Sequence, residues 1–335
     1  MYLKELTEIS GVSGYEKRVR EFVKEKIKDK VEGLEEDVLG NLIAWKKGRN
    51  SKKLILSAHM DEVGFMVSNI EEDGKLSIIP IGSVDVRAII GKKVLVGERE
   101  IPGIIGYKAI HLQRDDLLIP PNFNDIKVDI GATKRTEVEG KVKIGDFVAF
   151  AGNSMIHKEW FSGKGLDDRG GCSLLIDLIE KPINLAYDTY FVFSVQEEVG
   201  GKGAKIASER IKPDFAFVFE TTTSGDNPEF PEARRSTELG KGPVITPVHS
   251  GYANDERLFN FVLKVAKENN IPYQIKRRTV GGTDARIIAL ASGTPSLVIS
   301  IPSRYIHSPL CVMNLADYEN TLKLISILLE KEVEE

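Results

Sequence analysis

Residues that can bind a metal ion or move a proton recur in this sequence at the ends of apolar segments. The residues, each with the segment it follows, are His59 and Asp61 after "KLILSA", Glu197 and Glu198 after "YFVFSVQ", Glu220 after "FAFVF", and His307 after "SLVISIPSRYI". In open α/β sheets, ligands bind beyond the carboxyl ends of the strands, where such side chains converge. The pattern therefore predicts one site that collects side chains from several strands.

The types of side chain indicate which ions such a site would hold. Cys172 and Cys311 are the only cysteines in the sequence, too few for a thiolate cage or a disulfide framework. A metal must then use histidine and carboxylate ligands, a set that suits Zn²⁺, Co²⁺ or Mn²⁺ and argues against a structural zinc finger. Asp167 and Asp168, in "GKGLDDRGG", add two carboxylates just before a predicted helix.

Each of these residues also has a purely structural interpretation. Asp167 and Asp168 can cap the helix that follows, and Glu198 can stabilise a helix N-terminus. A histidine at the end of a strand is often an ordinary loop residue. These interpretations would all have to hold together, however, and four separate strand ends that each supply a ligand favour a metal site.

The adjacent carboxylates Glu197 and Glu198 suggest a division of labour. Consecutive side chains on an extended strand point to opposite sides, so the two cannot face one metal in the same way. One carboxylate can bind the metal while its neighbour takes a proton from an activated water and returns it to the leaving group. The pair therefore predicts a hydrolase.

The elements that must position these residues divide the chain into two kinds of segment. Outside residues 69–156, apolar strand-like segments alternate with amphipathic helical ones, which predicts an α/β domain with a mixed, largely parallel sheet sandwiched by helices. Residues 69–156 contain short alternating segments broken by Gly, Pro and Asp, without a helical period, which predicts a small all-β insertion. We therefore predict a discontinuous α/β domain, residues 1–68 and 157–335, interrupted by a β domain.

Several local features carry their own predictions. "SGYE" at residues 13–16 fits a capping box, with Ser13 capping the next helix, and Gly40-Asn41 fits a hairpin turn. In "GGTDA", Thr283 or Asp284 caps a helix or contacts substrate. His111 is predicted to be a surface loop residue.

Composition excludes some classes of function. The formal net charge is -4 and basic residues are interleaved with acidic ones, so a nucleic-acid partner is not expected. The first residues contain no signal-peptide pattern and no segment is long and apolar enough to cross a membrane, which predicts a cytoplasmic protein. Only three Gln accompany abundant Lys, Glu, Ile and Val, a balance that leans toward a heat-adapted source.

Five motifs together resemble a known family. "AHMDEVGFMV", "GLDDRGG", "VQEEVGGKGA", "GGTDA" and "RYIHS" occur in the order and approximate spacing of the tetrahedral (TET) aminopeptidases, also called deblocking aminopeptidases or FrvX-like proteins. The resemblance runs nearly end to end. It implies two divalent metal ions in an α/β aminopeptidase domain with a PDZ-like β insertion, and dimers that assemble into a dodecamer.

The resemblance also implies roles for individual residues. His59 and Glu220 would hold one metal ion, Glu198 and His307 the other, and Asp167 would bridge both. Glu197 would act as general base and acid, and Asp61 would orient the first histidine. Many family members carry Asp where this chain has Glu220, and the extra methylene can change how that carboxylate binds a metal.

The implied function is a dinuclear metal-dependent aminopeptidase that removes N-terminal residues from short peptides, with a metal-bridging hydroxide as nucleophile. The ligand set alone equally permits a carboxypeptidase or an N-acyl amino acid deacylase. A glycoside hydrolase using Glu197 and Glu220 would have no need of the two histidines. A non-catalytic peptide-binding scaffold is a further alternative. In the loop at 221–240, Arg234 and Arg235 could face a substrate, a partner subunit or water.

Overall fold

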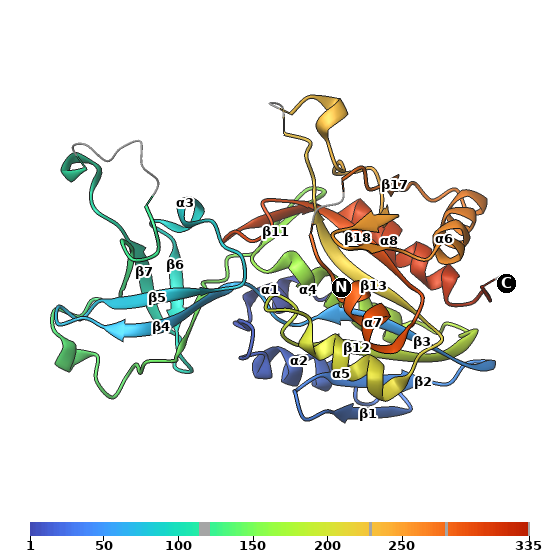
Figure 1. Ribbon diagram of the computed structural model, residues 1–335, viewed down its shortest axis with the longest axis horizontal. Coiled ribbons are helices and arrows are strands. Elements are labelled where there is room, and N and C mark those ends of the chain that lie inside the picture. The colour runs from blue at the N-terminus through green and yellow to red at the C-terminus, as the bar shows by residue number, and fades with distance from the viewer. Residues whose placement is uncertain (114–120, 228–229, 279–280, 334–335) are drawn as a thin grey trace.

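The computed structural model describes residues 1–113, 121–227, 230–278 and 281–333. A large α/β body carries a smaller β barrel at one side, and the barrel extends along the longest axis of the molecule (Figure 1). Within the described residues, no helix combines the length and the apolar character needed to span a bilayer.

A mixed sheet forms the centre of the α/β body. Its strands, in spatial order, are β1 (Gly33–Glu36), β2 (Leu42–Lys46), β12 (Tyr187–Ser194), β3 (Asn50–His59), β13 (Phe215–Thr223), β18 (Ser296–Arg304), β19 (Cys311–Asn314), β11 (Trp160–Gly163) and β10 (Met155–His157). Two further strands, β14 (Val244–Thr246) and β17 (Gln274–Ile275), extend from β18. The α/β class and the mixed sheet are thus as predicted.

Parallel pairing is concentrated at the middle of this sheet. β12, β3, β13 and β18 are parallel neighbours, whereas the strands flanking them, from β1 to β2 and from β19 to β10, pair antiparallel. The register sets Ser194 beside His59 and Glu220 beside Ser300. The carboxyl ends of the four parallel strands therefore meet at one edge, where the predicted ligands lie.

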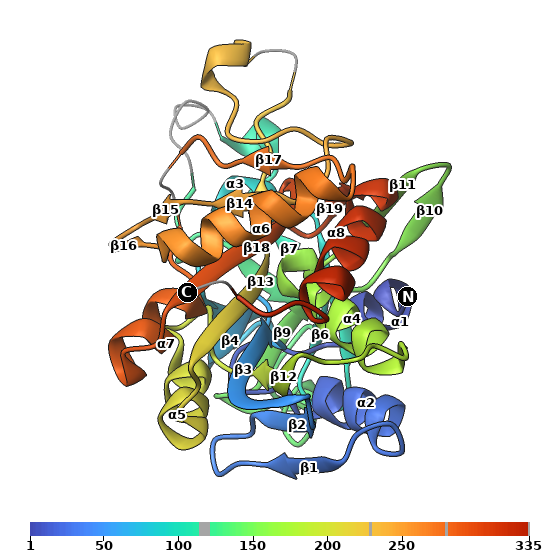
Figure 2. The ribbon, with the colours of Figure 1, turned by 90° about the vertical axis from the view of Figure 1, so that its right-hand side faces the viewer.

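Helices cover both faces of the sheet (Figure 2). One face carries α1 (Leu3–Glu8), α2 (Lys17–Ile27), α4 (Leu166–Glu180), α6 (Glu256–Glu268) and α8 (Leu315–Leu328); the other carries α5 (Lys202–Ile211) and α7 (Asp284–Ser292). Alternate residues of β3 serve the two layers, since Leu56 and Ala58 pack with the first group and Ile55 with the second. The predicted helical layers are confirmed.

The barrel is built from short strands and has a separate core. Its closed strand order is β4 (Gly64–Ile70), β5 (Leu76–Ile81), β8 (Lys127–Asp129), β7 (Ile101–Gly106), β6 (Lys93–Val96) and β9 (Phe147–Phe150). Phe65, Val67, Val94 and Val148 are among its buried residues. The predicted β character holds, although one short helix, α3 (Val86–Ile89), interrupts it. The barrel begins at Gly64, and the division of domains at 69 and 156 stays a prediction.

A buried ion pair holds the chain segment that leads from the body into the barrel. Glu62, just before β4, accepts a hydrogen bond at 2.5 Å from Lys164, which follows β11, and another at 3.0 Å from the backbone of Gly11. Both charged side chains are almost fully buried, and Arg169 lies 3.7 Å from the same carboxylate oxygen. Removing one partner of such a pair would leave a buried charge without its nearest counter-charge, so the contact fixes the segment that enters the barrel.

The predicted capping box is wrong. α2 begins at Lys17, and no side chain at its N-terminus makes a capping hydrogen bond. Ser13 instead donates to Asp61 at 2.6 Å, and Glu16 accepts from the backbone of Gly14 and Gln196. This segment therefore supports the candidate site, a long-range role that competes with local capping.

The predicted two-residue hairpin turn is longer than expected. β1 ends at Glu36 and β2 begins at Leu42, so the loop spans residues 37–41. Asp37 accepts backbone hydrogen bonds from residues 39–41, and Gly40 has a φ of 101°. The loop thus uses an aspartate-centred turn that still requires glycine at position 40.

Candidate metal centre

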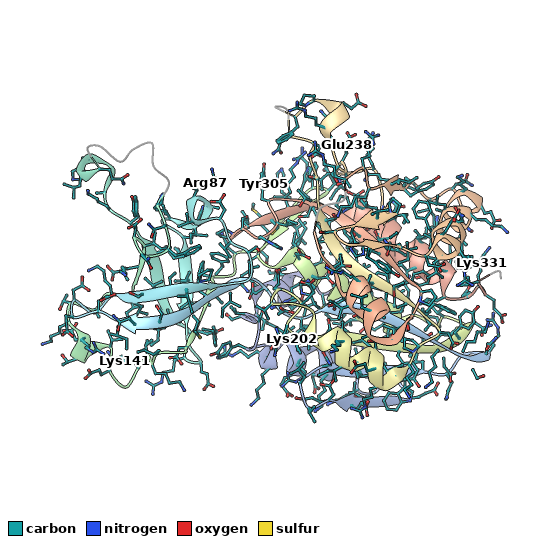
Figure 3. All side chains as sticks on the ribbon, in the orientation of Figure 1. Arg87, Lys141, Lys202, Glu238, Tyr305 and Lys331 are labelled. Carbon is teal, nitrogen blue, oxygen red and sulfur yellow. The ribbon has the colours of Figure 1, made fainter. Side chains whose placement is uncertain are left out.

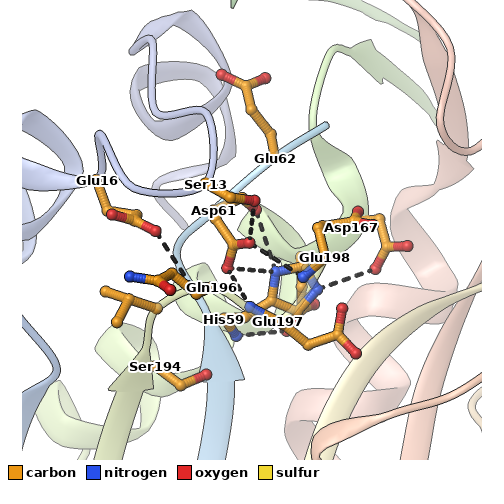
Figure 4. Close-up of polar contacts among 12 residues, drawn as sticks. Ser13, Glu16, His59, Asp61, Glu62, Asp167, Ser194, Gln196, Glu197 and Glu198 are labelled. Carbon is orange, nitrogen blue, oxygen red and sulfur yellow. Dashed lines mark hydrogen bonds and ion pairs between the residues drawn. The ribbon is translucent and has the colours of Figure 1, made fainter. Parts of the chain in front are cut away.

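All five predicted metal ligands converge at the carboxyl edge of the parallel strands. His59 is the last residue of β3 and is 2% exposed, and Glu220 lies within β13. Asp167 is in the first turn of α4, while Glu198 and His307 lie in the loops after β12 and β18. Figure 4 shows His59, Asp167 and Glu198 gathered around one point.

Asp167 lies between two histidine–carboxylate pairs. Its Oδ1 is 3.6 Å from His59 Nε2, which is itself 3.7 Å from Glu220 Oε2. Its Oδ2 is 3.3 Å from His307 Nε2, which is also 3.3 Å from Glu198 Oε1. Each oxygen of Asp167 therefore faces a different pair, the arrangement that a carboxylate shared between two ions requires.

Asp168 is a further acidic residue at the centre. Potential ligand atoms of His59, Asp168 and Glu220 lie within 4.8 Å of one another, as do those of His59, Asp167 and Glu198. Asp168 is fully buried, and its two oxygens accept backbone hydrogen bonds from His59 at 3.3 Å and Gly171 at 2.9 Å. These bonds give Asp168 a structural role that Asp167 lacks.

The unpartnered oxygens at the centre fit a cation. Within the part of the chain that the structure describes, Asp167 Oδ1, Glu198 Oε1 and Glu220 Oε1 are buried and have no hydrogen-bond partner. Buried polar atoms in proteins are nearly always hydrogen-bonded, and a bound ion is one of the explanations for an exception. Oxygen and imidazole nitrogen donors together suit divalent ions such as Zn²⁺, Co²⁺ and Mn²⁺.

The charges at the centre indicate the same need. Burial raises the pKa of Glu198 to about 8 and that of Glu220 to about 7, and the charge of Asp167 adds to both shifts. Burial also acts on Asp167, but the nearby imidazoles of His307 and His59 lower the pKa of this carboxyl overall. Carboxylates crowded in a buried site repel one another, and divalent cations would relieve that repulsion.

Glu197 and Glu198 lie in a turn, not on a strand as predicted. β12 ends at Ser194, Gln196 has a φ of 58°, and the Glu197 carbonyl accepts from the backbone of Gly200 at 2.8 Å. Strand alternation is therefore not the reason that the two side chains differ. Among the described residues, Glu198 belongs with His59 and Asp167 to a group that could hold a metal, whereas neither Glu197 nor His307 belongs to such a group. Burial raises the pKa of Glu197 well above its usual range.

Asp61 contacts both halves of the site. It is fully buried; its Oδ1 accepts from the backbone of Glu197 at 3.0 Å and lies 3.4 Å from His59 Nδ1. Its Oδ2 accepts from the backbone of Glu198 at 3.1 Å and from Ser13 Oγ at 2.6 Å (Figure 4). One carboxylate thus holds the first histidine and the turn that carries both glutamates.

Asp61→Asn is expected to weaken metal affinity or turnover by about 10- to 100-fold, because residues that orient metal ligands typically contribute that much. The change keeps the shape of the side chain but removes the charge facing His59. Isothermal titration with Zn²⁺ and steady-state kinetics would measure the effect. Asp73→Asn, at an exposed barrel position, is the matched control. An Asp61 variant that behaves like this control would make Asp61 an ordinary buried residue.

Some residues near the site were not identified from the sequence. Ser13 was assigned to a helix cap, and nothing in its spacing indicates its bond to Asp61. In the "GGTDA" motif, Thr283 accepts a hydrogen bond from the backbone of Ala285 and so caps α7. This agrees with the helix-capping role, one of the two roles predicted for the motif. Asp284 is buried and accepts from Ser194 Oγ at 2.7 Å, and burial raises its pKa to about 6.

The remaining sequence candidates lie away from the centre. Arg234 is exposed, and Arg235 forms an ion pair with Glu238 at 3.2 Å. Residues 228–229 of the same loop lie outside the described residues. His111 is exposed in a short 3-10 helix, which agrees with its prediction as a surface residue.

Two cavities adjoin the centre. One, of about 550 Å³, is lined by Asp167, Glu197, Glu198, Glu220 and His307 and continues between β14, β17 and α7. The other, of about 800 Å³, lies between the barrel and the loop that follows β18, where Tyr305 faces the barrel (Figure 3). His307 lines both. The centre is therefore open to a substrate larger than water.

Comparison with known proteins identifies the family. Residues 40–324 match the family described as M42 glutamyl aminopeptidase. The chain belongs to this family. A lysyl aminopeptidase of Pyrococcus furiosus is 35% identical over 342 residues, which cover 98% of this chain and 96% of the relative. The predicted resemblance to TET aminopeptidases is thus confirmed, and this M42 member is a peptide hydrolase.

Solved structures agree on the fold. The TET1 peptidase of Pyrococcus horikoshii, described as assembling into a tetrahedron or a large octahedral shell, has a TM-score of 0.88 at 34% identity and covers 98% of both chains. A Thermotoga maritima protein described as an endoglucanase has a TM-score of 0.84 at 48% identity, covering 98% of this chain and 97% of its own. The α/β architecture of this M42 chain is therefore shared by proteins with different descriptions.

Proposed function

We propose that this protein is a dinuclear metal-dependent aminopeptidase that removes N-terminal residues from short peptides. One observation carries the proposal: Asp167 presents one oxygen to His59 and Glu220 and the other to His307 and Glu198. His59 and Glu220 would hold one divalent ion, Glu198 and His307 the second, and Asp167 would join them. Zn²⁺ or Co²⁺ suits this donor set, and Mn²⁺ is a third choice.

Divalent ions bound at such a centre would polarise the scissile carbonyl and would lower the pKa of a water molecule so that it gives up its proton near neutral pH. Glu197 is assigned as the group that accepts the proton of that water and passes it to the departing amine. Burial raises the pKa of Glu197, and a raised pKa makes its carboxylate a stronger proton acceptor. Asp61 fixes the Glu197 backbone and so sets the direction of the side chain.

Extension of Glu220 by one methylene, relative to the Asp common in the family, does not remove it from the centre. Its Oε2 reaches within 3.7 Å of His59 Nε2 while Oε1 stays unpartnered and buried. Both oxygens are therefore placed to take part in metal binding, which supports a two-oxygen mode of coordination at this position.

The test is a panel of free and N-blocked aminoacyl and dipeptide substrates, assayed with the metal-loaded enzyme. An aminopeptidase releases the first residue only when its amine is free. Cleavage restricted to N-acylated amino acids would identify a deacylase, and release of C-terminal residues would identify a carboxypeptidase, both of which the ligand set alone permits.

The endoglucanase description of the Thermotoga maritima relative calls for a separate control. A glycoside hydrolase places two carboxylates on either side of the bond and has no use for a metal. Here the carboxylates are combined with His59 and His307, both within 3.7 Å of an acidic oxygen. Carboxymethylcellulose hydrolysis that persists after chelation would favour the glycosidase, and we expect none.

The barrel is assigned to assembly. Among the described residues, it contributes no proposed metal ligand, and the TET1 relative is described as forming closed shells. We propose that the barrel, taken as the PDZ-like insertion of residues 69–156, helps to pair subunits into dimers that build a dodecamer. Such a particle would admit short or unfolded peptides.

The native protein is expected to elute far above the 37.2 kDa of a single chain in size-exclusion chromatography with light scattering. Replacing the barrel, residues 64–150 from β4 to β9, by a short linker should give smaller particles that still bind metal, because the proposed ligands all lie in the α/β body. A full-length protein that remains monomeric at micromolar concentration with metal present would contradict the assembly role and leave the catalytic assignment intact.

A further inference from the structure

The larger cavity beside the metal centre lies between the barrel and the α/β body and has a wall from each. Residues of the segment from β5 to α3, among them Val84 and Ala88, form the barrel wall. The loop of residues 305–310, between β18 and β19, forms the body wall and contributes Ile306 and Leu310. Both walls therefore present apolar side chains to a space of about 800 Å³.

The barrel wall reaches the metal centre itself. Gly82 has a φ of 76°, and a Cβ added there would lie 2.8 Å from Val63 Cγ1 and 3.4 Å from Glu198 Cβ. Glycine suits this position both for its backbone conformation and for the close approach. Ser83, the next residue, lines this cavity and also the smaller cavity that contains the proposed ligands, as does His307. The two cavities therefore adjoin each other at the metal centre.

The body wall has an unusual backbone. Tyr305 and His307 have φ values of 62° and 58°, which residues other than glycine rarely adopt and which cluster at functional sites. Cys311 Sγ donates to the carbonyl of Tyr305 at 3.4 Å. The loop directs His307 to the centre while Tyr305, 53% exposed, faces the barrel (Figure 3). One loop conformation thus serves a proposed metal ligand and the cavity wall together.

The two sides of a scissile peptide bond need two places. Glu197, Glu198 and Glu220 line the smaller cavity and are absent from the lining of the larger one, so a cationic N-terminal amine is attracted to the smaller cavity. The rest of the peptide must then leave the metal centre in another direction. The larger cavity lies there, and its volume is in the range that holds whole small-molecule ligands.

We propose that the larger cavity is the subsite for the residues that follow the scissile bond, and that it selects an apolar second residue. The proposal rests on the aminopeptidase function proposed above, because only such an enzyme leaves the remainder of the peptide on this side of the centre. Tyr305 and Leu310 are 53% and 41% exposed, and an apolar side chain that enters the cavity removes their surface and its own from water.

Charged side chains have a smaller part in this subsite. Asp85 and Lys92 also line the cavity, both on the barrel wall and both exposed. Asp85 caps α3 and forms an ion pair with Arg87 at 2.5 Å. Ion pairs between exposed groups contribute little in water, so apolar burial decides which second residue is preferred.

The experiment compares kcat/KM for four tripeptides with the metal-loaded, assembled enzyme. All four share the first residue that is released fastest from free dipeptides, end in Gly, and have Leu, Asn, Glu or Lys in second place. Leu and Asn have nearly the same shape and differ in polarity. We expect Leu to exceed Asn by about 10- to 100-fold, as apolar pockets discriminate on this scale. Equal values for Leu and Asn would overturn the subsite, and a preference for Glu would assign selection to Lys92 and overturn it as well.

Variants of both walls locate the effect. Leu310→Gln should lower the Leu-to-Asn ratio of kcat/KM by about 10-fold, and Val84→Thr, which keeps the shape of the side chain, should lower it from the opposite wall. Leu310→Glu should raise kcat/KM for the Lys peptide above the wild-type value, because opposite charges then meet in the cavity. Leu290→Gln is the matched control: Leu290 is 71% exposed on α7 and, in the described part of the chain, lines neither cavity.

A second copy of this chain is the other possible occupant of the cavity. Light scattering of the same variants tests it. A Leu310→Gln enzyme that forms smaller particles and keeps the wild-type Leu-to-Asn ratio would make this wall a subunit contact and overturn the subsite.

The wild-type enzyme separates failure of the two proposals. Release of the first residue from all four tripeptides at similar rates would leave the aminopeptidase standing and remove the apolar subsite. Release of no residue from any free dipeptide, by an enzyme shown to contain metal, would overturn the aminopeptidase and the subsite together.

Discussion

Glu197→Gln is expected to lower kcat by roughly 10²- to 10⁴-fold, the usual contribution of a general acid and base, while metal content stays at the wild-type level. The amide keeps the size of the side chain but cannot take up the proton of the attacking water. Glu197 is half-buried, lines the cavity with the proposed ligands, and falls outside the groups of described residues that could hold a metal. Its loss should therefore affect proton transfer and not metal binding.

Glu198→Gln is the matched control for this prediction, because the two residues share one turn and both of their backbone N–H groups donate to Asp61. Glu198 Oε1 lies 3.3 Å from His307 Nε2 and has no hydrogen-bond partner. Its replacement should lose metal as well as rate. Metal analysis by inductively coupled plasma mass spectrometry, beside steady-state kinetics, separates the two outcomes. If Glu197→Gln loses metal and Glu198→Gln keeps it, the two roles must be exchanged.

Removal of all divalent ions is expected to abolish peptide hydrolysis, and readdition of Zn²⁺, Co²⁺ or Mn²⁺ to restore it to different degrees. Without a cation, the buried carboxylates of Glu198 and Glu220 have raised pKa values and face only histidines, so the centre holds no ion that can polarise a carbonyl. Turnover should be measured after exhaustive dialysis against a chelator, with metal analysis of the same sample.

Loss of structure must be excluded in that experiment. Circular dichroism and light scattering before and after chelation show whether the fold and the assembly survive. Full activity in a sample that contains no metal would be incompatible with the proposed mechanism. Activity that is lost together with the assembly and returns only on reassembly would instead place the metal requirement in subunit contacts.

The convergence of three proposed ligands could be predicted from a simple topological rule, which Asp167, in the first turn of α4, does not follow. His59 ends an apolar strand, and Glu198 and His307 follow apolar strands that are parallel to it in the sheet. The carboxyl ends of parallel strands share one edge, so alternation of helix and strand patterns was enough to bring them together. Glu220 lies inside β13 and still reaches the same place.

Long-range contacts and local backbone conformation could not be predicted in this way. The turn that carries Glu197 depends on Gln196 at a φ of 58°, a conformation that composition does not indicate for glutamine. Ser13 fits a capping pattern locally, yet its hydroxyl bonds to Asp61, 48 residues away in the sequence. The sequence also does not predict that Thr246, Lys276 and Arg286 line the cavity, because they come from three elements with no shared motif.

The buried pair of Glu62 and Lys164 has a mechanical consequence. In an assembly, contacts made by the barrel pull on the two chain segments that connect it to the α/β body. Glu62 is the residue that follows Asp61. It is anchored by Lys164 and by the backbone of Gly11. We infer that this anchor limits the movement that reaches the site: tension in the segment that enters the barrel ends at Glu62, and the carboxylate of Asp61 is shielded from movements of the neighbouring subunits.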